Sequence, residues 1–177
     1  HGLHHKRLLG LKGNQRLLDR QGDLLRNATR SQRLEAHIEE VRSNLKGSWS
    51  GVGIHRAILH FFNAVTGDLE NLEHEAETAN KMVEAIYTRH NQENPLNSMD
   101  APLFNVSRYQ RELAQLQQQS DQFRLQLKTL LTDPFILSKR FFDTLAQEVI
   151  ALHERIRSDA EQWADDALMP LMQHTME

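Results

Sequence analysis

One repeating pattern of apolar residues constrains the fold of this chain most. Between positions 58 and 86, apolar side chains recur at alternating intervals of four and three residues without a miss. These positions are Ile58, Phe62, Val65, Leu69, Leu72, Ala76, Ala79, Val83 and Ile86. Because this spacing places the side chains on one face of a helix, it predicts one long helix over about 52–89 with a narrow apolar seam. Such a seam needs neighbouring helices to cover it.

Three further segments have the same kind of spacing. They predict helices over about 3–45, 106–131 and 134–176. The apolar seam of the last helix begins with Phe142 and Leu145. Three glycines weaken the first half of the 3–45 segment by about 1 kcal/mol each relative to alanine. Pro134 follows Thr132 and Asp133, either of which can cap the last helix, and Pro170 predicts a kink or an end within it.

These segments predict an all-α protein, an elongated antiparallel four-helix bundle that forms a single module over 1–177. The short connections at Gly47 and Asp133 make their flanking helices antiparallel neighbours. Only 8 Gly and 4 Pro are present, which leaves little material for turns. Because the chain does not begin with Met, we expect it to be a fragment of a larger protein.

Motifs for catalysis are missing from the sequence. It has no Gly-rich phosphate loop of the GxxxxGK[ST] type, no HExxH and no Glu-x-x-His, although it contains 10 His. Neighbouring acidic pairs such as Asp165-Asp166 diverge around a helix, whereas acid–base catalysis needs convergent carboxylates. There is no Cys and hence no thiolate chemistry. We therefore expect no catalytic residue, no metal and no cofactor in this chain, and no enzymatic activity of its own.

Charge is distributed unevenly along the chain. Residues 1–33 hold eight Lys and Arg against two Asp, whereas residues 34–100 hold five basic and eleven acidic residues. A basic stripe at helical spacing is formed by Arg16, Arg20, Arg26, Arg30 and Arg33. The stripe predicts an anionic partner, either lipid head groups or a phosphate backbone. The alternative is a match to the acidic second helix or to a missing part of the parent protein. Stacking aromatics are missing from this stretch, so we expect no nucleic-acid partner.

Some apolar residues fall outside the seams. Phe61 and Phe141, together with Leu131, are candidates for self-association into a homo-oligomer if they are exposed. A wide core stripe would instead bury Phe61. Leu103 and Phe104, in the polar connection before the third helix, could form a membrane-dipping tip or pack back onto the helices as a hydrophobic staple.

Three stretches of the sequence resemble the C-terminal helical region, the stalk or neck, of bacterial dynamin-like GTPases. The first is Gly47-Ser48-Trp49-Ser50, which leads to Phe61-Phe62. The second is Ala85-Ile86-Tyr87-Thr88-Arg89 with a Pro-containing loop and then Phe104-Asn105-Val106-Ser107-Arg108-Tyr109 and Glu112-Leu113. The third is Leu131-Thr132-Asp133 with Arg140-Phe141-Phe142-Asp143-Thr144 and, later, Trp163 and Leu168-Met169-Pro170-Leu171. Their order covers residues from about 30 to 177.

The resemblance implies a parent protein whose GTPase domain is the partner of this chain and binds GTP and Mg. It implies a non-catalytic stalk or assembly module that transmits GTP-driven movement or mediates self-assembly in membrane remodelling. The expected location is cytoplasmic and peripheral to the inner membrane. No GTP-contacting residue carries over, because the nucleotide motifs are missing here. The alternative is a ligand-sensing four-helix-bundle domain of a transmembrane receptor, which matches the length and the number of helices.

Overall fold

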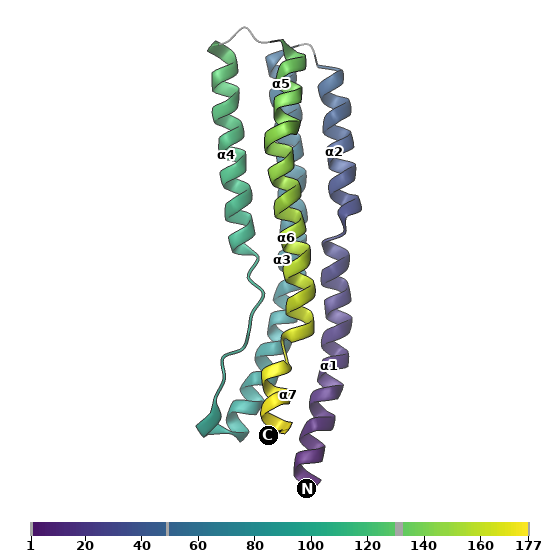
Figure 1. The fold of residues 1–177 in the computed structure, drawn as a ribbon, viewed down its shortest axis with the longest axis vertical. Coiled ribbons are helices and arrows are strands. Elements are labelled where there is room, and N and C mark those ends of the chain that lie inside the picture. Colours follow the sequence, from purple (N-terminus) through teal and green to yellow (C-terminus); the bar gives the residue numbers. More distant parts are fainter. Residues whose placement is uncertain (1, 49, 130–132, 177) are drawn as a thin grey trace. The chain divides into compact units, whose positions relative to one another are not determined.

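The computed structural model describes residues 2–48, 50–129 and 133–176, and these ranges contain helices and no strand. Helix accounts for 89% of the residues, so the all-α prediction is confirmed. The elements in Figure 1 are α1 (Gly2–Ala28), α2 (Ser31–Lys46), α3 (Gly51–Glu93), the 3-10 turn η1 (Pro95–Asn97), α4 (Ser107–Thr129), α5 (Pro134–Phe141), the π-helical turn η2 (Phe142–Ala146), α6 (Gln147–Asp166) and α7 (Met169–Met176). No described helix is both long enough and apolar enough to cross a membrane.

The long helix expected from the apolar seam is α3, which runs for 43 residues without interruption. Eight of the nine seam residues are buried, and the ninth, Ile86, is half-buried against a core cluster. The narrow seam therefore does face the protein interior along almost its whole length. α4 corresponds to the helix expected over 106–131, and its last positions, 130–131, lie outside the described residues.

The helix expected over 3–45 is not continuous. Thr29 and Arg30 separate α1 from α2, and Arg30 adopts an extended backbone conformation with φ −61° and ψ 133°. No Gly or Pro marks this break, and the apolar spacing gave no sign of it. Asn27, Thr29 and Ser31 all have modest helix propensity, so interrupting the helix here costs little.

The last segment, expected over 134–176, begins as predicted. The Oδ1 of Asp133 accepts a hydrogen bond from the backbone N–H of Phe135 at 3.0 Å and so caps α5. Helical structure then continues through η2 and α6 to Asp166 and resumes as α7 at Met169. Pro170 lies in the first turn of α7, where its missing N–H costs no hydrogen bond, so the predicted interruption near Pro170 is confirmed.

The π-helical turn η2 changes which aromatic residue enters the core. The seam predicted Phe142 as the buried position, but Phe141 is fully buried and Phe142 is half-exposed. A π-helical turn holds an additional residue compared with an α-helical one. The buried face therefore passes through Phe141 before the turn and through Leu145 within it.

The residues divide into two compact units. Unit 1 comprises His1–Ala28, Leu72–Asn105 and Arg157–Glu177, and unit 2 comprises Thr29–Asn71 and Val106–Ile156. Both α3 and α6 contribute residues to each unit.

Unit 1 contains a hydrophobic cluster. It consists of Leu11, Leu18, Val83, Tyr87, Ala167, Leu168 and Leu171, and α1 packs against α7. The Tyr87 hydroxyl donates a hydrogen bond of 2.7 Å to the Ala167 carbonyl, which lies in the turn between α6 and α7. This bond satisfies a buried carbonyl that the broken helix leaves without a helical partner.

The connection between α3 and α4 is held by side chains of unit 1. Asn80 donates to the carbonyl of Phe104 at 2.9 Å and accepts from its N–H at 2.8 Å. Asn91 makes the same pair of bonds to Met99, at 2.8 Å each. The Trp163 indole donates to the Pro102 carbonyl at 2.9 Å. Phe104 is buried against Trp163, so the packing alternative for Phe104 holds.

Unit 2 contains an aromatic cluster. Phe61 lies edge-on to Phe62 and to Phe141, with ring centroids 5.5 and 5.6 Å apart, and Phe142 lies edge-on to Phe141. The Arg42 guanidinium lies 4.5 Å from the Phe142 ring centroid. The cluster joins α3 to the α5–η2 segment and accounts for much of the aromatic content of this unit.

Candidate functional site

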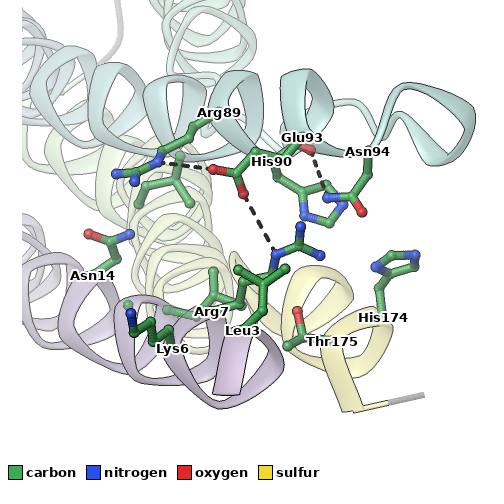
Figure 2. A pocket seen from close by; sticks show the side chains of 13 residues that line it. Leu3, Lys6, Arg7, Asn14, Arg89, His90, Glu93, Asn94, His174 and Thr175 are labelled. Carbon is green, nitrogen blue, oxygen red and sulfur yellow. Dashed lines mark hydrogen bonds and ion pairs between the residues drawn. The ribbon is translucent and has the colours of Figure 1, made fainter. Parts of the chain in front are cut away.

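Unit 1 contains a cavity of about 560 Å³ lined by α1, α3 and α7. This size is typical of small-molecule sites. Figure 2 shows the polar side chains that line it, and its full lining is Leu3, Lys6, Arg7, Gly10, Leu11, Asn14, Ile86, Arg89, His90, Glu93, Asn94, His174 and Thr175.

Helical spacing brings these residues together. On α1, positions 3, 6, 7, 10 and 14 share one face, because residues three and four apart are neighbours on a helix. On α3, positions 86, 89, 90 and 93 do the same at the C-terminal end of the helix. A cation near this end of the helix, such as Arg89, interacts favourably with the partial negative charge of the helix C-terminus.

Glu93 is the one carboxylate in the lining, and two arginines share it. The Nε of Arg89 lies 3.5 Å from its Oε1, and the Nε of Arg7 lies 4.0 Å from its Oε2. Lys6 has no carboxylate within 4.0 Å among the described residues. The permanently charged groups of the lining are therefore three cations and one anion.

Two histidines face each other in the cavity wall. The rings of His90 and His174 lie edge-to-face with centroids 5.1 Å apart. The Nε2 of His90 is buried and has no hydrogen-bond partner among the described residues. Burial lowers the pKa of His90, and the charges of His174 and Arg7 lower it further, while Glu93 opposes them. His90 is therefore held neutral in a region that disfavours additional positive charge.

The described residues contain no group of three or more His, Cys, Asp or Glu that could hold a metal ion. Outside the cavity wall, His37 contacts Asp68 at 2.8 Å and His60 contacts Glu40 at 3.0 Å. These are surface and half-buried pairs of unit 2. The chemistry available at the cavity is therefore that of cationic and hydrogen-bonding side chains, which suits the binding of an anion.

The five arginines of the predicted basic stripe lie on both units. Arg16, Arg20 and Arg26 belong to α1 in unit 1, whereas Arg30 and Arg33 belong to unit 2. The extended conformation at Arg30 interrupts the helical spacing on which the stripe was based, so one continuous helical stripe is not formed. None of the five lines the cavity.

Some of these arginines have intramolecular partners. Arg26 contacts Asp23 at 2.9 Å and Asp165 at 3.4 Å, and Arg33 lies 3.9 Å from Asp68 of α3. The contact between Arg33 and Asp68 is the ion pair expected if the basic residues interact with the acidic second predicted helix, which is α3. Arg16, Arg20 and Arg30 are exposed, and an anionic partner for them stays a prediction.

The exposed alternative for Phe61 and Phe141 is wrong. Phe61 is 1% exposed and Phe141 is 0% exposed, and the two rings pack against each other inside unit 2. The core stripe of α3 is wide enough to include the position next to the seam, which is why Phe61 is buried. A surface patch of these two residues is therefore not available, and Leu131 lies outside the described residues. Self-association by other surfaces stays a prediction.

The sequence reasoning did not identify the cavity. Lys6, Arg7 and Arg89 appear as ordinary charges, and His90 appears as one of ten histidines. The available signal was that the cations at positions 6, 7 and 89 lie near the ends of two predicted helices. Only the packing of α1, α3 and α7 brings them together.

Comparison of the chain with protein-family models, with characterised proteins and with solved structures finds no match.

Proposed function

We propose that this chain is a non-catalytic helical stalk or assembly module of a bacterial dynamin-like GTPase, arranged as an elongated antiparallel four-helix bundle. It transmits GTP-driven movement or mediates self-assembly in membrane remodelling. Its main partner is the GTPase domain of the parent protein, where GTP and Mg bind. Its location is cytoplasmic and peripheral to the inner membrane.

One observation carries the proposal: residues of the separate family-like stretches contact one another. Phe61 of the first stretch packs on Phe141 of the third, with centroids 5.6 Å apart. Phe104 of the second lies 5.9 Å from Trp163 of the third. The resemblance therefore involves residues that depend on each other in the folded protein, and such sets are harder to obtain by chance than isolated matches.

Another contact also joins the second and third of these stretches. The hydroxyl of Tyr87, in the second stretch, donates a hydrogen bond to the carbonyl of Ala167, which immediately precedes Leu168-Met169-Pro170-Leu171 of the third. Leu168 and Leu171 are fully buried in the same cluster as Tyr87. These residues fix the end of α6 and the start of α7. The resemblance therefore includes residues that determine where helices meet, as expected of a module with a mechanical role.

The continuity of α3 is also consistent with a mechanical role. Its 43 residues run through both units, and the Gly67 within it does not break the helix. An unbroken helix is stiff along its axis, because each residue is tied to the next turn by a backbone hydrogen bond. Such a helix suits a module that transmits movement.

The decisive experiment identifies the native polypeptide. An antibody raised against this chain is used to blot extracts of the cells that produce it, after photo-crosslinking with labelled GTP. We expect a labelled protein much larger than the 20.5 kDa of this chain, and no label on the purified 177-residue chain. Recognition of a protein that GTP does not label would refute the proposal.

The cavity of unit 1 favours a second candidate, a ligand-sensing helical domain of a transmembrane receptor. Sensor domains of this kind need a small-molecule site, and the cavity has a suitable size. The properties of the native polypeptide again distinguish the receptor from the GTPase. A receptor would contain apolar spans of about 20 residues and would stay in the membrane after alkaline extraction, whereas a peripheral GTPase would be released.

A further inference from the structure

We propose that the cavity of unit 1 is a binding site for the phosphate group of a small phosphorylated molecule or of a lipid head group, held by Lys6, Arg7 and Arg89. The proposal concerns this chain alone and does not depend on the parent protein. It rests on the composition and geometry of the cavity wall.

The charge of the wall is unbalanced. Three permanent cations face one carboxylate, Glu93, and both arginines approach it through Nε at 3.5 and 4.0 Å. Within the described residues, neither guanidinium has another carboxylate partner, so the terminal nitrogens of both remain available. These nitrogens form the part of the guanidinium that binds oxyanions in pairs.

The donors come from different directions. Figure 2 shows the Arg7 guanidinium on the side of His90 and His174, with Asn14, Lys6 and Arg89 on the opposite side of the cavity. A planar carboxylate has two oxygens and satisfies donors from one direction. A tetrahedral phosphate presents oxygens in several directions, so it matches donors supplied by α1 and α3 together.

The wall also has an apolar part. Leu3, Leu11 and Ile86 line the cavity beside the cations. The volume of about 560 Å³ exceeds what an inorganic anion needs and falls in the range of organic ligands. A phosphate attached to an organic group uses both parts of the wall, because the phosphate contacts the cations and the organic group covers the leucines and Ile86.

The state of His90 agrees with an anionic ligand. The groups that face it are Lys6 and Arg7 from α1, Arg89 and Glu93 from α3, and His174 from α7. Burial and the charges of His174 and Arg7 lower the pKa of His90. The same positive potential attracts an anion, and a bound anion in turn favours protonation of His90. Binding therefore strengthens as the pH falls.

Ring-proton NMR of His90 and His174 in the 177-residue chain tests the proposal. The chain is titrated with inorganic phosphate and, separately, with sulfate, whose charge of −2 does not change near neutral pH, with chloride keeping the ionic strength constant. We expect saturable shifts of both histidine signals, and tighter sulfate binding at about pH 6 than at about pH 8, because histidine charges in this range.

A matched pair of variants separates the site from general electrostatics. The Lys6→Gln/Arg7→Gln double variant removes two charges from the cavity wall, and we expect it to lower phosphate affinity at least about tenfold. The Arg16→Gln/Arg20→Gln double variant removes two charges from exposed positions of the same helix, outside the cavity. We expect it to change the affinity less than about twofold.

Vesicles distinguish the two sources of the phosphate. Co-sedimentation with phosphatidylcholine vesicles that contain phosphatidic acid, lost in Lys6→Gln/Arg7→Gln, supports a lipid head group as the ligand. Saturable binding of free phosphate without vesicle capture supports a small phosphorylated molecule. The proposal is overturned if no saturable shift occurs, or if both double variants weaken binding equally. It is also overturned if Lys6→Gln/Arg7→Gln lowers only the stability of the chain, because the cations would then serve the C-terminus of α3 alone.

Discussion

Two glycines of α1 allow the packing of unit 1 to be measured directly. Gly13 and Gly22 both lie inside the helix, but their surroundings differ. A Cβ added at Gly13 would meet nothing within 4 Å, whereas one added at Gly22 would lie 3.1 Å from the Cβ of Ala164 in α6. The Ala164 Cβ is fixed to its backbone, so it can move away only if the helix moves. The two substitutions to Ala therefore differ in packing while sharing the same change in helix propensity.

The magnitudes follow from these distances. Replacing Gly by Ala inside a helix stabilises it by about 0.5–1 kcal/mol, and we expect Gly13→Ala to gain this amount. At Gly22 the same gain is opposed by overpacking, which costs about 1–3 kcal/mol. Gly22→Ala should therefore have a free energy of unfolding about 1–3 kcal/mol below that of Gly13→Ala, and be neutral to destabilised relative to the unmodified chain.

Urea unfolding, followed by the fluorescence of Trp163 in a Trp49→Phe background, measures this difference in unit 1. Helix content by circular dichroism serves as the control that both variants fold. Equal stabilisation by the two substitutions would refute the reasoning, because it would mean that α1 and α6 are not in close contact at Gly22. A loss of stability in Gly13→Ala would mean that α1 is not a regular helix at that point.

Three further predictions concern single side chains. Leu69→Ala and Leu72→Ala should each lower the free energy of unfolding by about 2–5 kcal/mol, since both leucines are buried in the seam of α3, whereas the exposed Leu96 should tolerate alanine within about 0.5 kcal/mol by urea titration. Tyr87→Phe should cost about 1–3 kcal/mol, because the buried Ala167 carbonyl loses its donor, and hydrogen exchange should speed up at the start of α7. The lowered pKa of His90 means that the unfolded chain takes up a proton first, so stability is present above the ordinary value of 6.5 and is lost as the pH falls below it. His90→Gln should flatten this dependence in denaturant titrations at several pH values.

The helices could be predicted where the apolar pattern was long and regular. The seam of α3 gave its type and its approximate ends, and Asp133-Pro134 gave the start of α5 by ordinary capping chemistry. The break at Thr29–Arg30 was missed because no Gly or Pro marks it and the residues on both sides are compatible with helix. The shift from Phe142 to Phe141 was missed because a π-helical turn depends on tertiary packing and has no sequence signal of its own.

The cavity could not be predicted for a different reason. Its cations are separated by more than 80 positions in the sequence, because Lys6 and Arg7 lie on α1 and Arg89 lies on α3. Periodicity within one helix says which residues share a face, but it does not say which face of another helix lies opposite. The asparagines that clamp the α3–α4 connection, Asn80 and Asn91, were invisible for the same reason, since an amide has no preferred partner until the fold supplies a backbone.

The positions of Glu93 and Gln21 indicate how unit 1 distributes its polar groups. Gln21 is buried and donates to both the carbonyl and the carboxylate of Glu75, at 3.3 and 3.0 Å, so this polar contact between α1 and α3 is fully engaged. Farther along the same pair of helices, Glu93 is shared at 3.5 and 4.0 Å by two arginines and satisfies neither completely. If these groups served only to pack α1 against α3, close hydrogen bonds like those of Gln21 would be expected at Glu93 as well. A weakly engaged carboxylate between surplus cations leaves the α1–α3 pair able to accept a second anion, and this is the physical basis for assigning ligand binding to that end of unit 1.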